Sequence, residues 1–388
     1  MTDNNIHRAN KRGMVLAIDM GNTNIVIGCI DDDKVYFEER LATDLKKTEL
    51  EYVVLIKTVL ELYGIDSSQI SGAIISSVVP QLVNIIREAV EKLIDITPMV
   101  VGPGVKTGLN IHMDEPRRVG SDLIVDAVAA IKEYGAPVMI IDMGTATTIS
   151  IVDDKGSYAG GVILPGIRVS VDALASRTAQ LPRISLEAPG HVIGKNTLDC
   201  MKSGVVYGNA SCIDGMIDRM ADEIGIPLAS KENPHGIKVV ATGGLSRVIV
   251  PECRHDIIVD HALLLKGLKI IYDKNVKINF LEVMMSLTIE EIAMTIVGNA
   301  GEARSLAFEA LKEAKEGNYE KAKKYLEQSK ERSLAAHEMQ TELICNEADG
   351  NGIEMNLLMV HAQDHLMTSI LARELIEEMI TLYKKLDK

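Results

Sequence analysis

The chain has 388 residues, 47% of them hydrophobic and 25% charged, and its formal net charge is −14 at pH 7. This length allows two or three domains, while the acidic balance, the absence of Trp and the presence of only three Phe argue against nucleic acid as a partner. No apolar run approaches the roughly 20 residues that span a bilayer, so we expect no direct membrane insertion.

Residues 1–13 form a polar stretch that we predict to be a disordered extension. No signal peptide is recognised, and the five cysteines are dispersed without paired spacing. Scattered cysteines in odd number are typical of reduced thiols, so we expect a cytoplasmic protein.

Between residues 14 and 272, apolar β-rich runs alternate with helical patterns, which predicts an α/β fold with helix-flanked sheets. Strands are expected within 15–30, 72–79, 138–152 and 237–242. Helices are expected at 48–63, 80–95, 119–133, 168–178, 198–226 and 262–272.

The first β-rich run predicts a hairpin with small polar residues at its tip. A strand ends in Asp19, and a second strand follows from Ile25. Between them, Gly21 lets a phosphate approach the backbone, and the side chains of Asn22 and Thr23 can donate hydrogen bonds to it. Asp19 is placed to hold a hydrated Mg²⁺. An ordinary polar turn is the alternative.

A second hairpin repeats this pattern, which favours two related half-domains around one nucleotide. An apolar strand ends in Asp142, Thr145 lies in the tip, and another apolar strand follows. A third strand leads into Thr242-Gly-Gly244, whose glycines suit close approach to an adenosine. The set of three resembles the actin/hexokinase/Hsp70 ATPase superfamily, which implies a duplicated α/β kinase fold.

Finer motifs resemble type III pantothenate kinases over about residues 14–275. They are Asp19-Met-Gly-Asn-Thr23, Gly120-Ser-Asp122, Asp142-Met-Gly-Thr-Ala-Thr147, Gly160-Gly161 with Pro165-Gly166, and Gly194-Lys-Asn-Thr197. The resemblance implies transfer of the ATP γ-phosphoryl group to pantothenate, the first step of coenzyme A synthesis, by a homodimer with its acceptor site near the interface.

The resemblance also assigns roles to individual residues. Asp122 would be the general base, Asp19 an indirect ligand of Mg²⁺, and Asp142 a ligand of a monovalent cation, K⁺ or NH₄⁺. The expected ATP-binding residues are Asp19, Met20, Gly21, Asn22, Thr23, Asn24, Ile25, Val26 and Thr145. The expected substrate-binding residues are Met113, Gly120, Ser121, Asp122, Leu123 and Thr197. Alternatively, Ser121 or Asp122 caps the helix that begins there, and Thr197 caps the next.

The acceptor side departs from the family pattern at two positions. Leu123 stands where the family has Arg, and Met113 where it commonly has Tyr. Leu cannot replace an arginine clamp on a carboxylate, so Arg117 and Arg118 become candidates for that charge. Two further hypotheses follow: an ATP-binding pseudokinase that senses nucleotide and regulates the rest of the chain, and a kinase for another small hydroxyl acceptor.

After a predicted linker at 276–286, the remaining residues, 287–388, form a second predicted domain. It contains three long helical patterns at about 288–317, 319–347 and 355–386, with turn signals at 317–318 and 348–352. Such helices with short turns make an antiparallel three-helix stack, whose apolar stripes favour self-association.

The last helix carries His361, Asp364 and His365 on one face, because their spacing is three and four residues. The histidines are structural, or bind Zn²⁺, or include a phosphoryl acceptor at His361. A metalloprotease is not expected, because the Glu of His-Glu-x-x-His is missing.

The wider sequence favours the phosphoryl acceptor. Gly298-Asn-Ala-Gly-Glu-Ala-Arg-Ser305, Ala335-Ala-His-Glu-Met-Gln340 and Val360-His-Ala-Gln-Asp-His-Leu-Met-Thr368 resemble the lactose/chitobiose-type IIA component of the sugar phosphotransferase system (PTS). The resemblance implies that His361 takes a phosphoryl group from HPr and passes it to a sugar-specific IIB, and that Asp364 binds a divalent metal at a homotrimer axis. We therefore expect one bifunctional chain that assembles into a homo-oligomer.

Overall fold

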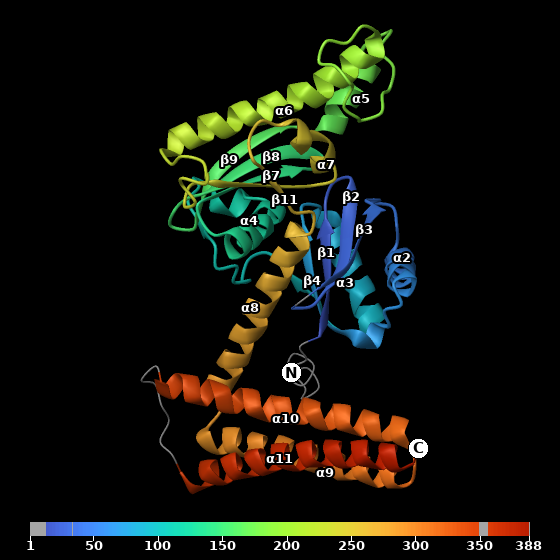
Figure 1. Cartoon of the computed structure of the whole chain (residues 1–388), viewed down its shortest axis with the longest axis vertical. Coiled ribbons are helices and arrows are strands. Elements are labelled where there is room, and N and C mark those ends of the chain that lie inside the picture. Colours follow the sequence, from blue (N-terminus) through green and yellow to red (C-terminus); the bar gives the residue numbers. More distant parts are fainter. Residues whose placement is uncertain (1–12, 33, 349–355, 388) are drawn as a thin grey trace. The chain divides into compact units, whose positions relative to one another are not determined.

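The computed structural model describes residues 13–32, 34–348 and 356–387. The chain divides into two compact units between Asn275 and Val276 (Figure 1). Except for Gly13, the extension predicted to be disordered lies outside the described residues, as does the turn expected at 348–352 apart from Ala348.

The N-terminal unit is built on two sheets with the same topology. The first has the order β3-β2-β1-β4-β5, and the second has β11-β10-β7-β8-β9 with β6 added at its edge. In each, three antiparallel strands are followed by two parallel ones. The equivalence of β1–β5 to β7–β11 is the internal duplication that the paired hairpins predicted.

The strands of the first sheet are β1 (Met14–Met20), β2 (Asn24–Ile30), β3 (Val35–Ala42), β4 (Ile70–Ser77) and β5 (Met99–Val100). Those of the second are β6 (Asn110–Ile111), β7 (Val138–Met143), β8 (Ala146–Val152), β9 (Ser157–Pro165), β10 (Lys238–Thr242) and β11 (Ile258–Val259). The sequence predicted both hairpins, β4 and β10, but missed the other five strands.

Helices form layers on the faces of the sheets. They are α2 (Glu49–Leu62), α3 (Pro80–Ile94), α4 (Ser121–Tyr134), α5 (Ile167–Arg177), α6 (Thr197–Ile224), α7 (Ser246–Ile249) and the start of α8 (Leu263–Ser286), together with short 3₁₀ turns at Ser67–Gln69, Pro116–Arg118 and Val250–Glu252. Helices α2 and α3 cover the outer face of the first sheet, and α5 and α6 cover the outer face of the second.

Helix α4 and the first part of α8 lie between the sheets. On α4, Val125 and Val128 pack toward the first sheet, and Ala127 and Ala130 pack toward the second. A helix buried on both faces needs small apolar side chains, which explains its Ala- and Val-rich sequence. The residues predicted as a linker, 276–286, form the last part of α8, so this segment is helical.

Two alternatives for helix caps were wrong. The N-cap of α6 is Asn196, whose side chain accepts a hydrogen bond from the Asp199 backbone at 2.9 Å, and Thr197 is the first helical residue. The N-cap of α4 is Gly120, so neither Ser121 nor Asp122 caps that helix.

The C-terminal unit contains α9 (Ile289–Lys315), α10 (Tyr319–Ala348) and α11 (Leu357–Leu386), as the periodicity predicted. A capping box between Thr288 and Glu291 begins α9. Buried alanines along α9 let both neighbouring helices approach closely: Ala293, Ala300, Ala303, Ala307, Ala310 and Ala314. Across these contacts, Ser329 of α10 donates to the Ala303 carbonyl and Ser369 of α11 to the Ala300 carbonyl.

Candidate functional site

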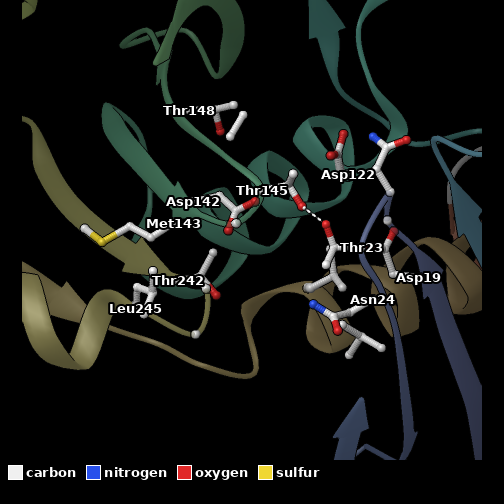
Figure 2. Close-up of a pocket in the computed structure, with 18 of the residues that line it drawn as sticks. Asp19, Thr23, Asn24, Asp122, Asp142, Met143, Thr145, Thr148, Thr242 and Leu245 are labelled. Atoms are coloured by element: carbon white, nitrogen blue, oxygen red, sulfur yellow. Dashed lines mark hydrogen bonds between the residues drawn. The ribbon is translucent and has the colours of Figure 1, made fainter. Parts of the chain in front are cut away.

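The tips of the two hairpins meet in the N-terminal unit. The hydroxyl oxygens of Thr23 and Thr145 lie 2.8 Å apart, although 122 positions separate them in the sequence. Figure 2 shows these side chains pointing toward each other, with Asp19 on one side and Asp142 on the other. The first tip is closed by hydrogen bonds from Gly21 to the Asn24 carbonyl and from Thr43 to the Gly21 carbonyl.

A cavity of about 650 Å³ opens between the tips. Its first wall includes Asp19, Gly21, Asn22, Thr23, Asn24 and Val26, and its second includes Asp142, Gly144, Thr145 and Thr148. Asp122 and Asp126 reach it from α4. Asp19 and Asp142 therefore share one cavity, which is the arrangement that a nucleotide gripped by both hairpins requires. The side chains of Met20 and Ile25, also predicted at the nucleotide, are fully buried in the core and do not line this cavity.

The Gly243-Gly244 turn closes the cavity at another end. Gly243 has φ +86°, and a Cβ there would lie 2.7 Å from Asp142 Oδ1. A Cβ at Gly244 would lie 2.9 Å from a guanidinium nitrogen of Arg40, which comes from β3. Only glycine gives this backbone its conformation and its close approach to the carboxylate.

Asp122 lies in the first turn of α4, where its carboxylate accepts a hydrogen bond from the Leu123 backbone at 2.9 Å. A Cβ at Gly120 would lie only 2.4 Å from Asp122 Oδ1, so Gly120 makes room for this orientation. Burial raises the pKa of Asp122, and the backbone hydrogen bonds oppose that rise.

Several carboxylates lie close together in the cavity, where burial shields them from water. Burial raises the pKa of Asp19 to about 7, opposed by a hydrogen bond from Ser76 and reinforced by Asp122 and Asp142. Burial and Asp122 raise the pKa of Asp142 to about 6, against the lowering effect of Arg40. The pKa of Asp126 is raised well above its usual value, mainly by burial and then by the neighbouring carboxylates. A bound cation would relieve this repulsion.

The residues present fit a magnesium ion held largely through water and phosphate. Asp19 Oδ1 is buried and has no hydrogen-bond partner. A single unpartnered carboxylate oxygen is a suitable protein contribution, because Mg²⁺ keeps several waters and binds substrate phosphates. Among the described residues, no group of three or more His, Cys, Asp or Glu side chains could hold a metal by itself.

Two histidines of the C-terminal unit, His361 and His365, lie near the start of α11. The rings of His361 and His365 lie edge to face with centroids 4.5 Å apart, which confirms their predicted common face. His361 and Asp364 are exposed, whereas Nδ1 of His365 is buried without a hydrogen-bond partner. Nearby, Gln363 of α11 accepts a hydrogen bond from Gln340 of α10. An exposed imidazole on a rigid helix can take and give up a phosphoryl group.

The comparisons with known proteins agree with this geometry. The family model for "Type III pantothenate kinase" matches residues 15–219. A type III pantothenate kinase of Halalkalibacterium halodurans is 45% identical over 263 residues, which are 68% of this chain and 100% of that protein. The chain belongs to the type III pantothenate kinase family. Another member, from an Exiguobacterium species, is 45% identical over 264 residues, again 68% and 100% of the two chains.

A second family model, "PTS system, Lactose/Cellobiose specific IIA subunit", matches residues 291–384. A solution structure of the IIA(Chitobiose)-HPr complex of Escherichia coli contains a chain that is 47% identical, covering 26% of this chain and 100% of that one, with a TM-score of 0.25. This type III pantothenate kinase therefore carries a PTS IIA domain. No described helix is both long and apolar enough to cross a membrane.

Most of the residues predicted to bind the acceptor do not line the cavity. Of that set, only Asp122 lines the cavity. Leu123 packs with apolar side chains between α4 and the second sheet. The side chain of Met113 is 40% exposed. Arg118 pairs with Glu115 at 2.6 Å, and neither Arg117 nor Arg118 lines the cavity. The roles of Met113, Leu123 and Thr197 thus stay predictions.

Several residues of the kinase cavity were missed by sequence reasoning. Glu38 and Arg40 line it from β3, a strand that was not predicted. His261 lines it from the segment before α8 and accepts a hydrogen bond from Arg247 at 2.7 Å. Asp126 could have been found, since it follows Asp122 by one helical turn and shares its face.

Proposed function

We propose that the N-terminal unit transfers the γ-phosphoryl group of ATP to the hydroxyl of pantothenate, the first step of coenzyme A synthesis. The observation that carries this proposal is the meeting of the two hairpin tips, with Asp19, Asp122 and Asp142 around one cavity. Phosphoryl transfer is catalysed mainly by positioning and charge stabilisation, and this cavity offers small donors and carboxylates for both.

In this mechanism, Asp122 holds the acceptor hydroxyl and takes its proton as the oxygen attacks the γ-phosphorus. The bond from that phosphorus to the bridging oxygen breaks, ADP leaves, and the proton passes later from Asp122 to solvent. Thr23 and Thr145 orient the phosphates by donating hydrogen bonds. Asp19 would hold Mg²⁺ and Asp142 a monovalent cation, K⁺ or NH₄⁺. When bound, these ions screen the phosphate charge.

The experiment is an ATP and pantothenate assay with the purified full chain, which follows ADP release and the phosphorylated product. Turnover that depends on pantothenate supports the proposal. ATP binding without turnover on pantothenate or on a panel of small hydroxyl compounds favours a nucleotide sensor that regulates the IIA domain. Turnover on another member of the panel favours a different acceptor. Leu123, which occupies the expected arginine position, motivates both alternatives.

For the C-terminal unit, we propose that His361 accepts a phosphoryl group from HPr and passes it to a sugar-specific IIB. The exposed imidazole beside His365 supports this assignment. Phosphate transfer from HPr should vanish in His361→Ala and persist in His365→Ala. Equal loss in both variants would contradict the assignment of roles.

The assembly is also a proposal. A kinase dimer and a IIA trimer, with Asp364 holding a divalent metal at the threefold axis, would combine in one chain to give a hexamer or a larger array. Exposed apolar side chains on both units, such as Ile193 at 82% and Leu371 at 56% exposure, suit such contacts. A light-scattering mass equal to the 42.3 kDa monomer would refute the proposal. ATP as the phosphoryl donor fits the cytoplasmic location expected from the cysteines.

A further inference from the structure

The inference concerns Ser76, the penultimate residue of β4, which no motif singled out. The parallel register of β1 and β4 pairs Ser76 with Asp19. Side chains at paired positions of neighbouring strands lie on the same face of a sheet. Ser76 has no exposed surface, and its hydroxyl lies where it can donate a hydrogen bond to the Asp19 carboxylate.

Ser76 has a second partner across the site. Its hydroxyl oxygen lies 2.9 Å from that of Ser121, the first residue of α4. Ser121 is tied to the end of β4 as well: it accepts from the Ser77 backbone at 3.1 Å and donates to the Ser77 carbonyl at 3.0 Å. The next residue on α4 is Asp122.

These contacts connect the two carboxylates that the reaction needs. A carboxylate can only accept hydrogen bonds, and a serine hydroxyl has one proton and two acceptor lone pairs. The Ser76 proton can therefore go to only one acceptor at a time, the Ser121 oxygen or the Asp19 carboxylate. When it goes to Asp19, the Ser121 proton can turn from the Ser77 carbonyl to the Ser76 oxygen. A series of hydrogen-bonding groups thus connects Asp19 through Ser76 and Ser121 to the first turn of α4, which contains Asp122.

We propose that Ser76 is a positioning residue of the kinase site, which with Ser121 sets Asp19 and Asp122 in one fixed geometry. By occupying one side of the Asp19 carboxylate, Ser76 leaves the unpartnered Oδ1 for the cation. By its hydrogen bond with Ser121, it adds to the two bonds from the Ser77 backbone that fix the start of α4 against the end of β4, and so helps to fix the position of the base. This inference rests on the proposed function.

Removing each serine should give a different result. Ser76→Ala frees the Asp19 carboxylate and removes one of the three hydrogen bonds of Ser121. The kcat should fall by about 10- to 100-fold, and the Mg²⁺ concentration that half-saturates ATP binding should rise about 10-fold. Ser121→Ala frees only the start of α4, so kcat should fall while the Mg²⁺ requirement for binding stays near that of the wild type. The double variant should lose less than the sum of the two single losses, because both changes remove the hydrogen bond between Ser76 and Ser121.

Calorimetric titration of the full chain with ATP at a series of MgCl₂ concentrations measures binding without acceptor or turnover. Ser71→Ala is the matched control, because Ser71 is a buried serine of the same strand whose hydroxyl, within the described part of the chain, bonds only the Met14 carbonyl, at 3.3 Å. It should change neither kcat nor the Mg²⁺ requirement, and thermal unfolding checks that all variants fold.

Wild-type kcat and Mg²⁺ requirement in Ser76→Ala would overturn the inference, as would equal losses in Ser76→Ala and Ser71→Ala. If the wild type does not phosphorylate pantothenate, the proposed function fails, but the Mg²⁺ requirement for ATP binding still tests Ser76.

Discussion

The buried Asp19 carboxylate should make the kinase unit less stable as the pH rises. Its pKa is raised from 3.8 to about 7, chiefly by burial. Above pH 4 the unfolded chain ionises this group freely, whereas the folded chain does so only near pH 7. The penalty is therefore absent below pH 4, grows between pH 4 and 7, and is complete above that.

Asp19→Asn removes this charge and keeps the shape of the side chain. Between pH 5 and 8 the wild type should lose about 2 to 3 kcal/mol relative to the variant, since each unit of pH between the two pKa values corresponds to about 1.4 kcal/mol and the slope falls off near pH 7. The variant should thus be the more stable protein at pH 8, although it loses kinase activity. Urea denaturation without nucleotide or metal, followed by circular dichroism at pH 5 and pH 8, measures the difference.

Asp66→Asn is the control with the opposite sign. Hydrogen bonds from Ser68 lower the pKa of Asp66, so its carboxylate stabilises the fold at neutral pH and loses that effect in acid. Parallel pH profiles for Asp19→Asn and the wild type would refute the account of Asp19 as a desolvated charge that awaits a cation.

Three further variants test the cavity. Asp122→Asn should lower kcat by about 10²- to 10⁴-fold and leave ATP affinity within about threefold, by coupled ADP release and calorimetry. Gly243→Ala places a methyl group against Asp142 and strains the backbone, so ATP binding should weaken at least about 10-fold, while phosphorylation of His361 by HPr stays unchanged. Arg40→Ala removes the charge that lowers the pKa of Asp142, so the acidic limb of kinase activity against pH should move to higher pH.

The parts of this fold that the sequence predicted are those in which interacting residues are close in the chain. Asp19 and Thr23 share one hairpin, as do Asp142 and Thr145, and each hairpin needs only alternating apolar residues around a polar tip. Recognising the pattern twice was enough to predict that the tips face one cavity. Strand β3 was not predicted, because three consecutive charged residues, Glu38, Glu39 and Arg40, interrupt the alternation of apolar and polar residues that is typical of a strand.

Residues whose role depends on how distant strands pair could not be predicted in this way. Ser76 is important only because β4 lies parallel to β1 with Asp19 opposite it, and that pairing brings together positions 57 residues apart. A one-residue shift would turn the Ser76 side chain to the other face, where α2 or α3 would cover it. The periodicity of a single segment does not determine this register between β1 and β4.

In the C-terminal unit, too, contacts within one helix could be predicted, whereas contacts between helices could not. The contact between His361 and His365 follows from a spacing of four on one helix, so the sequence alone predicted it. The hydrogen bond between Gln340 and Gln363 joins two helices, and it depends on how α10 and α11 rotate about their axes. That rotation is set by packing on the alanine face of α9, because side chains as small as Ala293 and Ala300 allow close approach. The local pattern therefore predicts which histidine is the proposed phosphoryl acceptor. The contacts between α10 and α11 depend instead on how both helices pack on α9.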